Sequence, residues 1–137
     1  MEGKNMQARM RSFIIVAVIP MFSASCSLPV SFSKDINPIL VANCLACHDG
    51  SGEGSSTSGF SVQTYDSIMQ GTKYGPVIIP GSSESSTLYR MIAHKVDRKI
   101  QMPPHHDEAL AKGREDSLTP RQIEFIQKLI DQGAKNN

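Results

Sequence analysis

Aromatic side chains, net charge and long apolar runs are all scarce in this chain of 137 residues. Aromatic residues make up 6% of the sequence and tryptophan is absent, so the chain has little bulky apolar mass for a core. The formal net charge of +1 leaves no excess of cationic side chains to neutralise phosphates, which argues against nucleic-acid binding. The longest apolar run, residues 13–22, is interrupted by Pro20 and is about half the length of a membrane-spanning helix.

The N-terminal segment has the three-part arrangement of a secretory signal. Lys4, Arg9 and Arg11 precede the apolar run, and the small residues 23–25 follow it. A buried core helix is the alternative, but the basic flank and the lack of helix caps favour export. We therefore expect residues 1–25 to be a removable signal peptide. The remaining 112 residues (137 − 25) have the size of one domain and a net charge of −1 (11 − 12).

The small residues before Cys26 resemble the lipobox of bacterial lipoproteins, in which the cysteine becomes the acylated N-terminus. The match departs at Ser23, where that motif usually has leucine. Cleavage nearby that leaves Cys26 as a free thiol is the alternative. Lipidation is favoured because it explains an odd third cysteine in an exported chain. We expect residues 26–33 to be a tether between a lipidated Cys26 and a folded domain over residues 34–137.

Helix signals dominate that domain, and strand patterning is nearly absent. Asp35 is the expected N-cap of the first helix, Thr64 and Gly71 bound the second, and Thr119 opens the last with a capping box. The expected helices cover residues 36–43, 65–70, 86–94 and 120–132. We therefore predict a small all-α domain of about four short helices with long loops rich in Gly, Ser and Pro. Residues 49–59, almost wholly Gly and Ser, are expected to be a flexible, solvated connector.

Cys44, Cys47 and His48 form the most informative motif, Cys-x-x-Cys-His. This is the attachment sequence for c-type haem. Two thiols add across haem vinyl groups to form thioethers, and the following histidine gives its Nε2 to the iron as the proximal ligand. The motif closes a predicted helix in a chain predicted to be exported, and bacterial haem attachment of this kind occurs after export. We expect one covalent haem c, which also supplies the apolar mass that the composition lacks.

Two other functions of the cysteine pair remain open. A thioredoxin-like Cys-x-x-Cys opens a helix after a strand, whereas this pair closes a helix with no strand before it. A zinc site would need two further ligands. His105 and His106 are candidates, although adjacent residues rarely aim both rings at one metal.

Met102, which two prolines follow, is the expected distal ligand of the haem iron. A thioether is a soft ligand that raises the reduction potential relative to a second imidazole. The prolines stiffen the loop that would hold the sulfur. His94, His105 and His106 are rival ligands, and core packing is the alternative role for Met102.

The motifs above and several others follow one another in the order found in class I cytochrome c domains, and they resemble the motifs of those domains. They are closest to a group also found in planctomycete and Bacteroidetes multidomain proteins. The resemblance covers about residues 32–134 and implies an all-α fold around one haem, crossing terminal helices, and His48 and Met102 as axial ligands. Leu129 departs from it, since an aromatic residue usually stands there, and residues 105–117 are unusually long and polar. The matching stretches are Phe32-x-x-Asp35-Ile36-x-Pro38-Ile39-Leu40, Cys44-x-x-Cys47-His48, Gly59-Phe60-Ser61-Val62 with Tyr65, Ile79-Pro80-Gly81, Ser86-x-Leu88-Tyr89, Met102-Pro103-Pro104, Leu118-Thr119-x-x-Gln122-Ile123 and Ile130-x-x-Gly133-Ala134.

Together these features predict a monohaem electron carrier in the bacterial periplasm, anchored to a membrane through Cys26. Its partners would be a redox protein that donates electrons and another that accepts them. The basic segment 94–99 is either a solvated face or a rim that steers an acidic redox partner. No acid–base or nucleophile constellation is visible, so we expect neither enzyme activity nor a small-molecule substrate. The alternatives are a haem subunit of a larger oxidoreductase, a small peroxidase, or a haem sensor whose distal methionine is displaced.

Overall fold

The fold is known from a computed structural model that describes residues 28–104 and 118–137. Across these residues the regular structure is helical, apart from an isolated bridge between Thr72 and Gly75, and this confirms the all-α prediction. The elements are a π-helix η1 (Phe32–Ile36), α1 (Asn37–Asn43), α2 (Glu53–Ser58), α3 (Tyr65–Gln70), α4 (Thr87–Ile92), a 3₁₀-helix η2 (Arg98–Ile100) and α6 (Pro120–Asp131). The predicted signal peptide, Cys26 and residues 105–117 lie outside the described residues.

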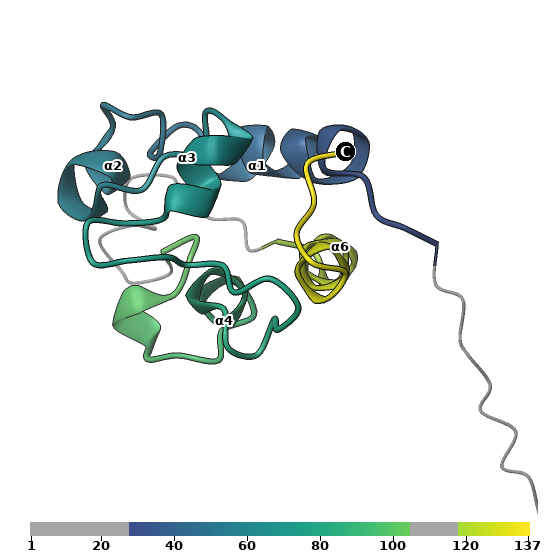
Figure 1. Cartoon of the computed structure of the whole chain (residues 1–137). Helices are drawn as coiled ribbons and strands as arrows, with labels where there is room; N and C mark the ends of the chain where they lie inside the picture. The colour runs from purple at the N-terminus through teal and green to yellow at the C-terminus, as the bar shows by residue number, and fades with distance from the viewer. Residues whose placement is uncertain (1–27, 105–117) are drawn as a thin grey trace, which may run out of the picture.

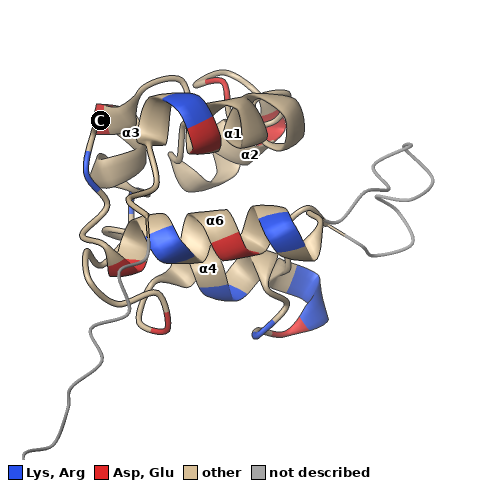
Figure 2. Cartoon of the chain, turned by 90° about the vertical axis from the view of Figure 1, so that its right-hand side faces the viewer, with Lys and Arg blue, Asp and Glu red and all other residues tan. Residues whose placement is uncertain are grey.

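The helices form two tiers, with α1, α2 and α3 in one and α4 and α6 in the other (Figures 1 and 2). The four predicted helices are present as α1, α3, α4 and α6. Local capping explains two of them: the Thr64 side chain caps α3 through a capping box with Ser67, and Thr119 caps α6 in the same way with Gln122. The helix α4 ends earlier than predicted, at Ile92, and the backbone of His94 is left-handed with φ of 56°.

Asp35 is not the N-cap of α1, as the sequence predicted. The chain begins to coil one turn earlier, in η1, where Ser31 is the N-cap and its hydroxyl accepts a hydrogen bond from the Lys34 N–H. The Asp35 carboxylate accepts from the Ser31 N–H at 2.8 Å. The aspartate therefore stabilises the start of the helix from inside its first turn, where a negative charge also favours the helix dipole.

The core lies between the N-terminal helices and α6. Ile36 and Leu40 are buried there with Ile126 and Ile130, and α6 packs on both η1 and α4. The aliphatic Leu129, which stands where an aromatic residue is usual, is itself buried. The N-terminal end is held further by an edge-to-face contact between the Phe32 and Tyr65 rings, whose centroids are 5.1 Å apart.

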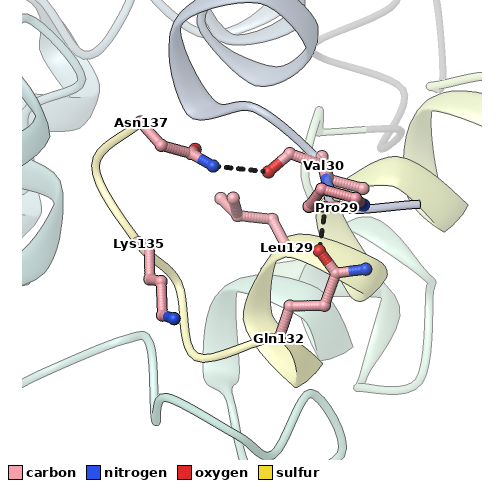
Figure 3. Close-up of a pocket in the computed structure, with 6 residues that line it drawn as sticks. All are labelled: Pro29, Val30, Leu129, Gln132, Lys135 and Asn137. Carbon is pink, nitrogen blue, oxygen red and sulfur yellow. Dashed lines mark hydrogen bonds between the residues drawn. The ribbon is translucent and has the colours of Figure 1, made fainter. Parts of the chain in front are cut away.

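The folded domain begins earlier than residue 34. Val30 and Phe32 are both buried, and both are hydrogen-bonded to the C-terminal end of the chain (Figure 3). The Asn137 side chain donates to the Val30 carbonyl at 3.3 Å and accepts from the Phe32 N–H at 2.8 Å, while Gln132 accepts from the Val30 N–H. Residues 30–33 of the predicted tether are therefore packed. A shallow pocket of about 230 Å³ lies beside this contact, lined by Pro29, Val30, Leu129, Gln132, Lys135 and Asn137 (Figure 3).

No helix in the described part of the chain has the length and apolar character that crossing a membrane requires.

Replacement of Ile130 by alanine is expected to lower the free energy of unfolding by about 2–5 kcal/mol, because its side chain is fully buried and its removal leaves a cavity. Ile123→Ala on the same helix is the matched control. Its side chain is only half-buried, so we expect a smaller loss of about 1 kcal/mol. Urea unfolding of the purified variants measures both values, and equal losses would contradict the described packing of α6.

Candidate cofactor site

The Cys-x-x-Cys-His motif forms the turn that ends α1. The N–H of Cys44 donates to the Leu40 carbonyl at 2.8 Å, so this residue still continues the helix. The N–H groups of Cys47 and His48 then both donate to the Cys44 carbonyl, at 3.2 and 2.9 Å. Both cysteines are half-buried free thiols. The structure therefore brings together the two thiols and the imidazole that the sequence singled out, on one tight turn.

The His48 ring is oriented by Phe60. Its Nδ1 lies 3.2 Å from the Phe60 carbonyl oxygen, and the two aromatic rings meet edge to face with centroids 5.3 Å apart. A carbonyl oxygen can only accept, so this hydrogen bond requires the proton on Nδ1. In the neutral ring the lone pair is then on Nε2. This is the tautomer that a histidine needs to bind a metal through Nε2, with its other nitrogen held by the protein.

Two glycines allow α2 to close against the motif. A Cβ atom at Gly54 would lie 2.5 Å from Cε1 and 2.7 Å from Nε2 of His48. A Cβ atom at Gly52 would lie 2.7 Å from the Cys47 carbonyl oxygen. Both distances are shorter than any real side chain tolerates, so only glycine permits this approach.

Residues 49–59 are mostly solvent-exposed, as predicted, but they are partly helical and hydrogen-bonded to the motif, contrary to the prediction of a flexible connector. The Asp49 side chain accepts from the N–H groups of Ser51 and Gly52, which forms a tight turn and holds the pKa of that carboxyl below its usual value. The helix α2 follows, and its Ser55 N–H donates to the Cys47 carbonyl at 3.0 Å. The loop is therefore tied back to the motif by backbone and side-chain hydrogen bonds that its Gly- and Ser-rich composition did not reveal.

Ser55 and Phe60 are the site residues that sequence reasoning missed. The buried Ser55 hydroxyl donates to the Phe60 carbonyl at 2.8 Å and accepts from the Gly50 N–H at 2.9 Å. A second hydrogen bond joins this segment to the motif, since the Val62 N–H donates to the His48 carbonyl at 2.8 Å. The only signal in the sequence was the Asp49-x-Ser51-Gly52 turn, which could have indicated an ordered start to this segment.

Cys44 does not have the electrostatics of the nucleophile in a redox-active dithiol. Burial first, and the neighbouring Cys47 second, raise the pKa of the Cys44 thiol to about 11. Cysteines that act as nucleophiles in disulfide exchange have lowered pKa values, because the thiolate is the reactive form. Cys44 is a protonated thiol at neutral pH, which disfavours the thioredoxin-like alternative.

Three histidines are candidates for rival metal ligands, and His94 is the one that the described residues include. Within residues 28–104 and 118–137, no group of three or more His, Cys, Asp or Glu side chains is placed to hold a metal ion. His105 and His106, the candidate zinc or iron ligands, lie outside those residues. His94 is exposed just after α4.

Met102 lies in a loop that follows η2 and is tied to α4. Its N–H donates to the Met91 carbonyl at 3.3 Å, which ties its loop to the end of α4, and its side chain is half-buried against the core. Just before it, Asp97 caps η2 and the Gln101 side chain donates to the Val96 carbonyl at 3.1 Å. The peptide bond that follows Met102 is cis. These contacts give the methionine a defined loop, and its role as an iron ligand stays a prediction.

The residues present fit a large apolar group. Several sulfur-containing and aliphatic side chains are only half-buried at the edge of the core, where they retain surface for a further partner. They come from the motif turn, from α3, from α4 and from the methionine loop: Cys44, Leu45, Met69, Leu88 and Met102. Two free thiols, an imidazole whose Nε2 carries no proton and half-buried apolar side chains are the kinds of group that would hold a haem.

In the chain without haem, the Cys44 thiol is expected to react with iodoacetamide roughly a hundredfold more slowly at pH 8 than in the denatured chain. A pKa of about 11, against 9.0 for an ordinary thiol, leaves that much less thiolate. Peptide mass spectrometry resolves Cys44 from the other two cysteines, and circular dichroism verifies that the helices are present. Equal rates in the folded and denatured chains would show that Cys44 is not buried as described.

Comparison with known proteins gives one match. Residues 44–106 match the family model described as Planctomycete cytochrome C. The matched stretch begins at Cys44, contains Cys47 and His48, and extends past Met102. No curated protein and no solved structure matches the chain.

Proposed function

We propose that this chain is a monohaem electron carrier of the bacterial periplasm, because residues 44–106 match the family model described as Planctomycete cytochrome C. The observation that carries the proposal is the motif turn itself. It presents two free thiols and an imidazole whose Nδ1 is held by a backbone carbonyl, so that Nε2 is available to a metal.

Four residues have assigned roles. Cys44 and Cys47 hold the porphyrin through thioethers, His48 is the proximal ligand through Nε2, and Met102 is the distal ligand through its sulfur. When bound, haem supplies a one-electron couple between ferrous and ferric iron. The protein orients the imidazole through Phe60 and positions the Met102 loop through the Met91 carbonyl, and half-buried apolar side chains would pack against the bound group. No proton or group transfer is assigned to its residues.

The leader and Cys26 support export and anchoring to a membrane. Because Val30 is already packed against the domain, only residues 27–29 separate Cys26 from it. The four residue steps from Cys26 to Val30 reach at most about 14 Å at 3.3–3.6 Å per residue. An acyl chain on Cys26 would therefore hold the domain close to the membrane surface, within reach of membrane-bound redox proteins.

The partners we propose are a redox protein that donates electrons and one that accepts them. The segment 94–99 supplies a basic rim just before the methionine loop, with exposed Arg98 and Lys99 on η2 and Ile100 beside them, 48% exposed. Lys95 is engaged elsewhere, since it pairs with Glu84 and lies over the Tyr89 ring. An acidic patch on a partner would complement the part of the rim around η2.

Replacing Met102 with leucine tests the ligand assignment at nearly constant volume. The matured holoprotein is expected to give a low-spin c-type reduced spectrum, and a weak far-red iron–sulfur band when oxidised. Met102→Leu should lose that band, whereas the control Met91→Leu, a half-buried methionine outside that apolar set, should keep it. A high-spin spectrum in the unmodified protein, or an iron–sulfur band that survives in Met102→Leu, would contradict the assignment of Met102 as the distal ligand. The high-spin spectrum would favour a peroxidase or sensor, and the surviving band would assign the sulfur ligand to another methionine.

A Cys26→Ser variant tests the anchor separately from the haem site. We expect this variant to move from the membrane fraction to the soluble periplasmic fraction and to lose labelling by radioactive palmitate. Its haem spectrum should stay unchanged, because Cys26 lies outside the motif. Membrane retention with palmitate labelling in Cys26→Ser would contradict lipidation at this residue.

A further inference from the structure

The Phe60 carbonyl oxygen accepts two hydrogen bonds at once, one of them from the His48 ring. The Ser55 hydroxyl donates to it at 2.8 Å and the His48 Nδ1 at 3.2 Å. The serine bond is of ordinary length for an O–H donor, whereas the histidine bond is at the long end for an N–H donor. Two donors therefore share one acceptor, and the serine has the shorter contact.

Ser55 is built into the site in a way that fixes this sharing. It is buried, with 6% of its surface exposed, so water does not compete for its hydroxyl. Its oxygen accepts from the Gly50 N–H at 2.9 Å, which leaves the hydroxyl proton to point at Phe60. Its own N–H donates to the Cys47 carbonyl at 3.0 Å.

The Phe60 carbonyl does not depend on Ser55 for its place. The Phe60 N–H donates to the Ser58 hydroxyl at 3.1 Å. Two residues further on, the Val62 N–H donates to the His48 carbonyl at 2.8 Å. These two bonds, together with the contact between the His48 and Phe60 rings, keep the carbonyl beside the imidazole.

We propose that Ser55 is a positioning residue that weakens the hydrogen bond from His48 Nδ1 to the Phe60 carbonyl and thereby raises the reduction potential of the haem. This inference rests on the proposed function. A hydrogen bond from Nδ1 gives the imidazole partial anionic character and makes it a stronger electron donor, which favours ferric over ferrous iron. A serine that occupies part of the acceptor limits this effect.

The test compares the midpoint potentials of Ser55→Ala and Ser56→Ala holoproteins with that of the unmodified protein. Removal of the Ser55 hydroxyl frees the Phe60 carbonyl for His48, so the potential should shift to a more negative value. Ser56→Ala removes an exposed hydroxyl of the same helix, which donates to the Ser51 carbonyl, and it should leave the potential unchanged. Ser55→Thr keeps the hydroxyl and should restore the original value. An unchanged or more positive potential in Ser55→Ala would overturn the proposal.

A measurement on the unmodified protein keeps the test independent of variant folding. In the reduced, diamagnetic holoprotein, the Ser55 hydroxyl proton should be a slowly exchanging NMR resonance with a nuclear Overhauser effect to the His48 Nδ1 proton, because both point at one oxygen. Absence of that protected proton would also refute the role of Ser55. A failure of the proposed function is distinguishable, since the unmodified protein would then carry no covalent haem at all.

Discussion

The hydrogen bond from His48 to the Phe60 carbonyl is the contact on which the rest of the site depends. It selects the tautomer whose Nε2 can bind a metal, and it can form only because residues 49–62 fold back on the end of α1. That return requires the Asp49 turn, a helix with glycine at position 54, and a buried serine at position 55. A segment of low sequence complexity thus fixes the orientation of the His48 ring.

The parts of the fold that the sequence predicted are those with local causes. Thr64 and Thr119 cap their helices through residues three positions on, and the apolar stripe of α6 needs only the helical period to be recognised. The Cys-x-x-Cys-His motif is equally local, since its spacing alone carries the chemistry. The family match over residues 44–106 agrees with that reading.

The parts that the sequence did not predict depend on contacts between distant residues or on polar side chains bound to backbone. The composition of the α2 segment predicts a flexible connector because Gly and Ser are typical of linkers, and nothing local shows that Ser55 reaches Phe60. Val30 was placed in a tether because its partner, Asn137, lies at the other end of the chain. Asp35 was assigned to the wrong helical position because η1 begins one turn earlier.

Covalent attachment of a single haem to Cys44 and Cys47 is the central claim, and the intact mass of the protein matured in a bacterial periplasm tests it most directly. The account predicts a mass higher than that of the polypeptide by one haem, and no such increase when both cysteines are replaced by serine. A mature protein that folds and is exported with the mass of the polypeptide alone would contradict covalent haem attachment. The two thiols would then belong to a redox dithiol or a zinc site.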